Sequence, residues 1–230
     1  MRNLWIYGCS FSYPFWDGEI KDAGVPKITT AEGWPSILSK KLNYKCQNRA
    51  QPGYGWNHIS YNLEKDIVEG RIRKDDIIVI SPSFFSRVTF PEVDDDKIPN
   101  QDLTEFSARY CYDHSTFVQM NIKRFTYKLL TLKELGYKVA GWIWSNPIDV
   151  GCSFRDHHLL KIKESLIPAP DGNFIWEDWI IKNPECMVIP GELRPNLSWD
   201  GDTHFSSYGH KIAAEQIYSS VSKFSKVQII

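Results

Sequence analysis

The sequence lacks an excess of charge of either sign. Its 230 residues include 27 Lys and Arg against 28 Asp and Glu, which gives a formal net charge of −1 at pH 7. Binding to nucleic acid or to an anionic membrane surface usually needs a clustered excess of basic side chains. We therefore expect a protein that binds neither nucleic acid nor membranes.

Long apolar runs are missing too. No stretch approaches the roughly 20 apolar residues that a membrane-spanning helix needs. Residues 1–3 lead directly into a short apolar segment, without the hydrophobic region of a secretory signal peptide. We expect a soluble chain that is not exported by the usual signal.

Cysteine is infrequent and irregularly placed. The five cysteines are Cys9, Cys46, Cys111, Cys152 and Cys186. Their odd number and the absence of any Cys-x-x-Cys spacing argue against both a disulfide framework and a zinc site. Reduced thiols are typical of the cytosol, so a cytoplasmic location is expected. The pattern predicts no metal, and nothing in the sequence requires another cofactor.

Short apolar runs alternate with amphipathic stretches along the chain. Strands are expected at 4–7, 44–48, 77–80, 138–144 and 186–189, and the main helices at 33–42, 57–69, 117–135 and 206–224. Residues 199–204 are expected to form a loop. Alternating strands and helices predict a parallel sheet with helices on both faces, a three-layer α/β/α fold, because right-handed crossovers place them there. No linker or repeat divides residues 1–230, so a single domain is expected.

The first apolar run stops at Gly8-Cys9-Ser10. An apolar run ended by glycine predicts a buried strand, and open α/β sheets place their ligands at the carboxyl ends of the strands. Ser10 is therefore a candidate nucleophile, although residues 8–12 fit a simple loop with a serine helix cap equally well. Cys9 is expected to pack beneath the turn, because successive residues after a strand point in different directions.

Two more polar loops follow expected elements, at 48–57 and 200–210. Together with residues 8–12 they resemble the SGNH (GDSL-like) hydrolase superfamily, which is named for a Ser, a Gly, an Asn and a His in separate sequence blocks. The resemblance follows the block order from one end of the chain to the other. It implies a flavodoxin-like parallel sheet and a serine hydrolase.

The resemblance also assigns roles to individual residues. It implies Ser10 as the nucleophile, with Cys9 where the family usually has Asp, and His204 as the base. The backbone N–H of Gly53 is implied as an oxyanion donor beside that of Ser10. Such a site works because the imidazole takes the serine proton, a carboxylate orients the imidazole, and fixed N–H donors meet the developing oxyanion.

The last block departs from the family pattern. The family has an Asp three residues before the His, and this chain has Gly201 there. Asp202 and Asp200 are the two nearby carboxylates. We favour Asp202 as the residue that orients His204, because a loop absorbs a change of one residue easily.

The family's Asn-containing block after the central strand is missing. Ile80 is followed by Ser-Pro-Ser-Phe-Phe-Ser-Arg at 81–87. Ser83, another hydroxyl or Arg87 is expected to supply a replacement donor; otherwise the oxyanion hole is one donor short. Asn57, at the end of the second block, completes the residues expected to bind substrate.

These residues are compatible with three functions. The first is a serine esterase or deacylase that acts on small acyl esters, with a carbohydrate as one candidate substrate. The second is an O-acyltransferase that uses the same acyl-enzyme, and the third is a binding or structural module with a disabled oxyanion hole. Four tryptophans lie in or beside the site loops: Trp16, Trp34, Trp56 and Trp199. Their indole faces could stack on sugars, although most tryptophans pack in cores.

His210 is expected to have a structural role on the first turns of the closing helix rather than a catalytic one. The acyl group, the acceptor and the oligomeric state do not follow from the sequence.

Overall fold

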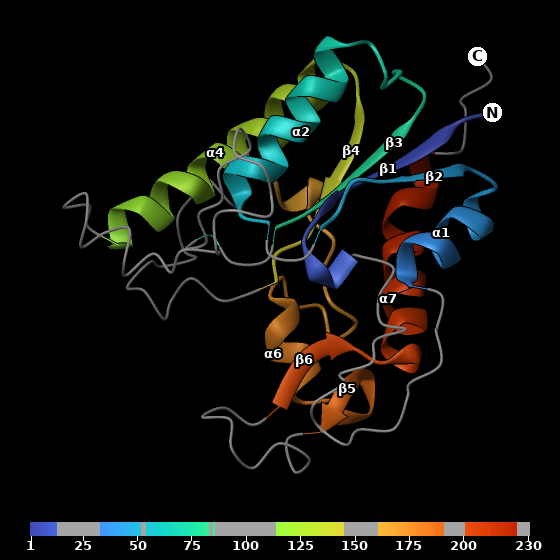
Figure 1. Cartoon of the computed structure of the whole chain (residues 1–230), viewed down its shortest axis with the longest axis vertical. Helices are drawn as coiled ribbons and strands as arrows, with labels where there is room; N and C mark the ends of the chain where they lie inside the picture. The colour runs from blue at the N-terminus through green and yellow to red at the C-terminus, as the bar shows by residue number, and fades with distance from the viewer. Residues whose placement is uncertain are drawn as a thin grey trace.

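The computed structural model describes residues 1–12, 33–51, 54–82, 85, 114–144, 161–190 and 201–224, and the side chains of all of these except 114–115, 188–190 and 201–203. Figure 1 shows a central sheet with helices on two sides of it and a small pair of strands below. Among the described helices, none is both long and apolar enough to cross a membrane.

Four parallel strands form the central sheet. They are β1 (Asn3–Gly8), β2 (Lys45–Asn48), β3 (Ile77–Ser81) and β4 (Lys138–Gly141), in the spatial order β2-β1-β3-β4. This is the order of a flavodoxin-like sheet. Beyond β4, isolated parallel bridges join Gly141 to Leu166 and Ile143 to Ile175. All five residues of β3 are buried, as expected for a parallel strand covered on both faces.

Helices cover both faces of this sheet (Figure 1). On one face lie α1 (Trp34–Leu42) and α7 (Ser207–Val221), which contact each other. On the other face lie α2 (Trp56–Val68) and α4 (His114–Glu134). The predicted three-layer α/β/α fold with a parallel sheet is confirmed.

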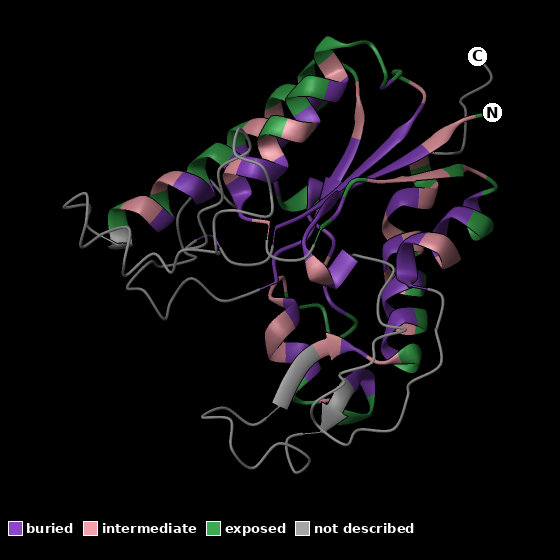
Figure 2. Ribbon diagram, in the orientation of Figure 1, coloured by how far each residue is buried: buried purple, intermediate pink, exposed green. Residues whose placement is uncertain are grey.

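The side chains of β1 pack alternately against the helices on the two faces of the sheet. Leu4 and Ile6 belong to the core cluster under α1 and α7, whereas Trp5 and Tyr7 belong to the cluster under α2 and α4. Successive side chains of a strand point to opposite faces, so one apolar run fills both cores. Figure 2 shows the sheet and the inner sides of the helices as the buried part of the molecule.

One region differs from the sequence prediction. Of the strand predicted at 186–189, residues 187–189 are in a strand, but this strand, β5 (Met187–Pro190), pairs antiparallel with β6 (Gly201–Phe205) in a separate two-stranded sheet. The prediction of a loop over 199–204 is wrong for residues 201–204. The polar sequence of β6 has no strand-like alternation, and its extended form depends on pairing with β5.

Short elements connect the larger ones. They are η1 (Ser10–Ser12), η3 (Lys163–Ser165), α6 (Trp176–Ile181), η4 (Pro184–Cys186) and η6 (Ser222–Phe224). Of these, η1 follows β1 directly and contacts β6. The turn after the first strand is thereby brought against the strand that carries His204.

Candidate active site

The turn after β1 holds Ser10 at the carboxyl edge of the sheet. The Ser12 N–H donates to the Cys9 carbonyl oxygen at 3.0 Å, and Asn48 Nδ2 donates to the Ser12 carbonyl oxygen at 2.8 Å. Cys9 and Ser12 are fully buried, as the sequence predicts for Cys9, whereas Ser10 is partly exposed. The turn is therefore fixed from behind and presents Ser10 toward the surface.

Gly8 allows β1 and β3 to approach closely below this turn. A Cβ atom on Gly8 would lie 2.2 Å from Ser81 Oγ and 2.8 Å from Ser12 Oγ. The two serine hydroxyls are hydrogen-bonded to each other between the strand ends. Only glycine fits at position 8 without displacing this hydroxyl pair.

The structure brings Ser10 and His204 together. They are 194 positions apart in the sequence, and His204 Nε2 lies 2.7 Å from Ser10 Oγ. This separation is within the range in which an imidazole removes a hydroxyl proton. The His204 ring also stacks on Phe11, with ring centroids 4.5 Å apart.

His210 lies behind the site. It is 5% exposed, and its Nδ1 accepts a hydrogen bond from the Trp34 backbone N–H at 3.2 Å. Nδ1 accepts only when it carries no proton, so the neutral ring holds its proton on Nε2. Burial, and to a lesser extent the charge of nearby His204, lower the pKa of His210 to about 4. These contacts are those of a structural histidine.

The second sequence block runs beside the nucleophile turn. The Gln51 N–H donates to the Gly8 carbonyl oxygen at 3.3 Å, and Asn48 Oδ1 accepts from the Ala50 N–H at 2.9 Å. The Arg49 guanidinium is held by Asp66, with Nε 3.0 Å from Oδ2. Residues 48–51 are thus anchored to β1 and α2.

Several expected site residues lie outside the described part of the chain: Gly53, Ser83, Arg87 and Asp200. Asp202 is in β6, where it is paired with Ile189, and its side chain is not described. Their roles remain predictions.

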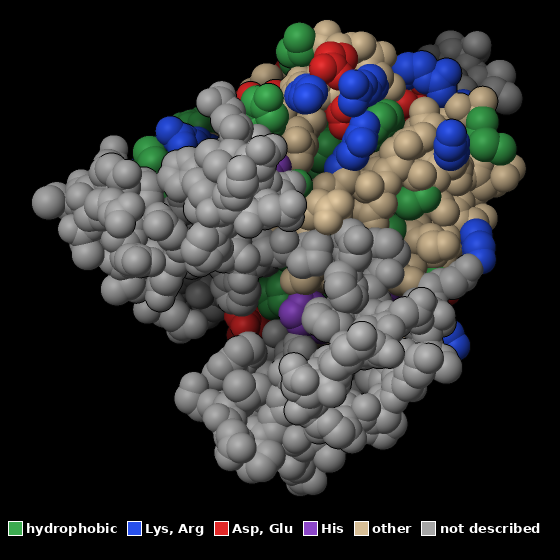
Figure 3. Space-filling view, in the orientation of Figure 1, with side chains coloured by type: hydrophobic (Ala, Val, Ile, Leu, Met, Phe, Trp, Pro, Cys, Tyr) green, Lys and Arg blue, Asp and Glu red, His purple; other side chains and the backbone are tan. Residues whose placement is uncertain are grey.

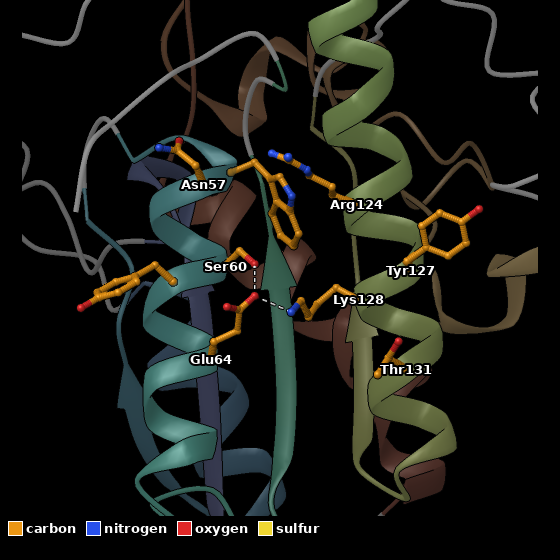
Figure 4. Close-up of a pocket in the computed structure, with 9 residues that line it drawn as sticks. Asn57, Ser60, Glu64, Arg124, Tyr127, Lys128 and Thr131 are labelled. Atoms are coloured by element: carbon orange, nitrogen blue, oxygen red, sulfur yellow. Dashed lines mark hydrogen bonds and ion pairs between the residues drawn. The ribbon is translucent and has the colours of Figure 1, made fainter. Parts of the chain in front are cut away.

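Asn57 lies in the first turn of α2 and lines a pocket of about 440 Å³ between α2 and α4 (Figure 4). Glu64 crosses the pocket. It accepts hydrogen bonds from Ser60 Oγ at 2.9 Å and from Lys128 Nζ at 2.5 Å. Arg124 lies on the α4 side near the level of Asn57. The Glu64–Lys128 pair ties the two helices together.

The tryptophans that the structure describes near the site loops are buried. Trp34 and Trp56 are 0% and 2% exposed and belong to the core rather than to a sugar-stacking surface, while Trp16 and Trp199 are not described. Trp144, which the sequence offers only as a strand residue, stacks on Phe11 with ring centroids 3.7 Å apart. The sequence indicates a place near the site for Trp144 only through its position at the end of an expected strand.

In the coloured part of Figure 3, Lys and Arg side chains lie beside Asp and Glu side chains. Within the described residues, no group of three or more His, Cys, Asp or Glu side chains is placed to hold a metal ion.

Comparison with known proteins gives neighbours in structure alone. No family model matches the sequence, and no curated protein matches it. The chain is similar to a solved structure from Desulfitobacterium hafniense described as lipolytic and of the G-D-S-L family, with 11% identity, coverage of 96% of this chain and 99% of the other, and a TM-score of 0.49. It is also similar to a catalytic mutant of the acetylxylan esterase Axe2 from Geobacillus stearothermophilus (14% identity, coverage 96% and 94%, TM-score 0.48). A third neighbour is a lipase/acylhydrolase from Enterococcus faecalis (16% identity, coverage 98% and 96%, TM-score 0.41).

The strand order of the sheet shows how the fold positions the two candidate catalytic residues. The parallel order β2-β1-β3-β4 places the turn with Ser10 at the end of a central strand, and β6 brings His204 to it. The chain has a flavodoxin-like, three-layer α/β/α fold. Residues 8–12 are in contact with His204, and residues 48–51 are hydrogen-bonded to the turn after β1.

Proposed function

We propose that this protein is a serine esterase or deacylase that removes small acyl groups through an acyl-enzyme on Ser10. The observation that carries the proposal is the 2.7 Å contact between His204 Nε2 and Ser10 Oγ. In the first step Oγ bonds to the ester carbonyl carbon while its proton passes to Nε2. The proton then goes to the leaving alcohol oxygen as the C–O bond breaks, and water hydrolyses the acyl-enzyme by the same route.

The remaining parts of the site complete this proposal. Asp202 is assigned to orient His204, and the Gly53 backbone N–H to stabilise the oxyanion together with that of Ser10. Ser83 or Arg87 is assigned to replace the donor that the family takes from Asn. One oxyanion donor contributes about 3 to 4 kcal/mol to lowering the barrier, so a missing replacement would slow turnover by about a hundredfold or more.

The proposed substrate is a small acyl ester, with a carbohydrate ester as the first specific class to assay. The proposal treats residues 1–230 as one domain that needs no cofactor and works in the cytoplasm. In the described part of the chain, Cys9, Cys46 and Cys186 are not in disulfide bonds, which is compatible with that compartment.

The decisive experiment is Ser10→Ala, assayed with a chromogenic acetyl ester and with a fluorophosphonate probe. Loss of the nucleophile should reduce kcat by at least about a thousandfold and abolish labelling, without lowering the thermal midpoint. Ser219→Ala is the matched control, because Ser219 is an exposed serine of α7 whose hydroxyl donates to the Gln216 carbonyl oxygen. Equal labelling of the Ser10→Ala variant and the unsubstituted protein would contradict the assignment of Ser10.

The same assay separates the other functions. Acylated product formed when acceptor sugars are supplied would identify acyl transfer, because the acyl-enzyme is then intercepted by a sugar hydroxyl instead of water. An unsubstituted protein that neither turns over esters nor reacts with the probe would identify a binding or structural module.

A further inference from the structure

Three aromatic rings lie in a stack at the contact between Ser10 and His204. The His204 imidazole and the Phe11 ring have centroids 4.5 Å apart and planes inclined by 17°. Phe11 in turn stacks on Trp144, with centroids 3.7 Å apart and an angle of 19°. Phe11 is 4% exposed and Trp144 is 1% exposed, so the support under the imidazole is inside the protein.

Trp144 connects the two chain segments that carry the reacting groups. It stacks on Phe11, the residue after Ser10, and it packs edge-on against Phe205, the residue after His204, with centroids 5.3 Å apart. A single side chain beyond the end of β4 thus contacts the immediate neighbours of both Ser10 and His204.

Phe11 is also held through its backbone. The Trp34 indole Nε1–H donates to the Phe11 carbonyl oxygen at 2.9 Å, and Trp34 is fully buried. The hydrogen bond fixes the backbone from which the Phe11 ring projects, and the stack on Trp144 restrains the ring itself. Such fixed supporting contacts are what keep catalytic groups within the narrow range of productive geometry.

We propose that Phe11 and Trp144 are positioning residues for His204, a role that rests on the serine-hydrolase function proposed above. The stack holds the imidazole with Nε2 directed at Ser10 Oγ. The π face of Phe11 also stabilises the positive charge that His204 gains when it takes the Ser10 proton, since aromatic faces attract cations.

The point in the reaction at which His204 is charged predicts which kinetic constant a substitution in the stack should change. His204 becomes positive only as the Oγ–carbonyl bond forms, and it returns to neutral when its proton passes to the leaving oxygen. Interactions present only in the transition state change kcat and leave substrate binding unaffected. If Phe11 and Trp144 acted only by stabilising the fold, their substitution would instead lower the fraction of folded protein, without a specific change in kcat of the folded enzyme.

The kinetic test compares Phe11→Leu with Phe11→Tyr. Leu keeps the apolar contact and removes the π face, so kcat should fall about tenfold while KM stays within about twofold. Tyr keeps the ring and should restore most of kcat. Phe125→Leu is the control, because Phe125 is equally buried in the α2/α4 cluster and its loss should reduce stability without changing kcat of the folded protein. Unchanged kcat in Phe11→Leu would overturn the proposal.

An NMR measurement tests the stack without any activity. A proton above an aromatic face is shifted upfield, so the His204 Hε1 signal, assigned by its loss in His204→Asn, should lie upfield of a solvated histidine and move downfield in Phe11→Leu. An Hε1 signal of the unsubstituted protein at an ordinary position would overturn the proposal, even if Phe11→Leu does not fold. If the unsubstituted protein shows neither hydrolysis nor probe labelling, the serine-hydrolase function fails, and the Hε1 position still decides whether the stack exists.

Discussion

His210 should make the folded protein sensitive to acid. The folded state keeps its ring neutral until the pH falls to about 4, because burial and the charge of His204 lower its pKa from the ordinary 6.5. In the unfolded chain the ring is in water and binds a proton below about pH 6.5. Between these two values the unfolded state binds more protons than the folded state, so the free energy of unfolding decreases as the pH is lowered.

The size of this effect follows from the two pKa values. The shift is about 2.5 pH units, and each unit is worth about 1.36 kcal/mol, which gives a loss of about 3 kcal/mol between pH 6.5 and pH 4. A single-domain protein is stable by only about 5 to 15 kcal/mol, so this one histidine would remove a large fraction. Below about pH 4 the contribution should level off, because both states are then protonated.

The measurement is urea unfolding, followed by tryptophan fluorescence, from pH 7.5 to pH 4.5 in steps. The perturbed protein is His210→Asn, whose side-chain oxygen can still accept from the Trp34 N–H but which does not titrate. Asn is smaller and should be less stable at every pH. The test is therefore the difference in the free energy of unfolding between the two proteins, which should shrink by about 2 to 3 kcal/mol from pH 7.5 to pH 4.5. A difference that stays constant over this range would refute the reasoning.

Three further substitutions have defined outcomes. Gly8→Ala should lower the free energy of unfolding by about 2 kcal/mol, because its Cβ would meet Ser81 Oγ at 2.2 Å, and adding Ser81→Ala should cost less than the sum of the two single changes. Asp76→Asn should cost about 3 kcal/mol at pH 7, since the fully buried carboxylate accepts from the backbone N–H groups of Asn3 and Arg73 and from Trp5 Nε1. These hydrogen bonds outweigh burial and lower the pKa of Asp76, so this difference should persist at neutral pH and shrink as the pH falls below about 4. Glu64→Gln should change stability by less than about 1 kcal/mol, because the Glu64–Lys128 pair is half-exposed. Urea midpoints at matched pH check all three, and a silent Gly8→Ala or Asp76→Asn would contradict the packing described.

Local patterns predicted most of the α/β framework. The continuous apolar run at 77–80 is β3, and the spacing of Ile59, Leu63 and Ile67 predicts α2 to within one residue at either end. The serine at 206 caps α7 by accepting from the Gly209 N–H at 3.1 Å. These elements could be predicted from the sequence because each is specified by its own periodicity and caps, which do not depend on distant partners.

The parts that sequence reasoning missed depend on distant contacts. Residues 201–205 have the composition of a loop, and they are extended because β5 provides their hydrogen-bonding partner. The stack of His204, Phe11 and Trp144 joins residues from three separate segments, and no local spacing relates them. Trp34 and Trp56 lie beside site loops in the sequence but are core residues, because the helices that they begin turn them inward.

The contacts behind Ser10 explain how the turn keeps its shape. Cys9 is fully buried in the cluster under α1 and α7, so an apolar contact anchors this position. Its neighbours supply polar anchoring: the Ser12 and Ser81 hydroxyls are hydrogen-bonded across the strand ends, and Asn48 Nδ2 donates to the Ser12 carbonyl oxygen. The geometry of the nucleophile therefore depends on groups that never reach the substrate. Substitutions at Asn48 or Ser81 should for that reason disturb the Ser10–His204 distance while leaving both reacting side chains chemically intact.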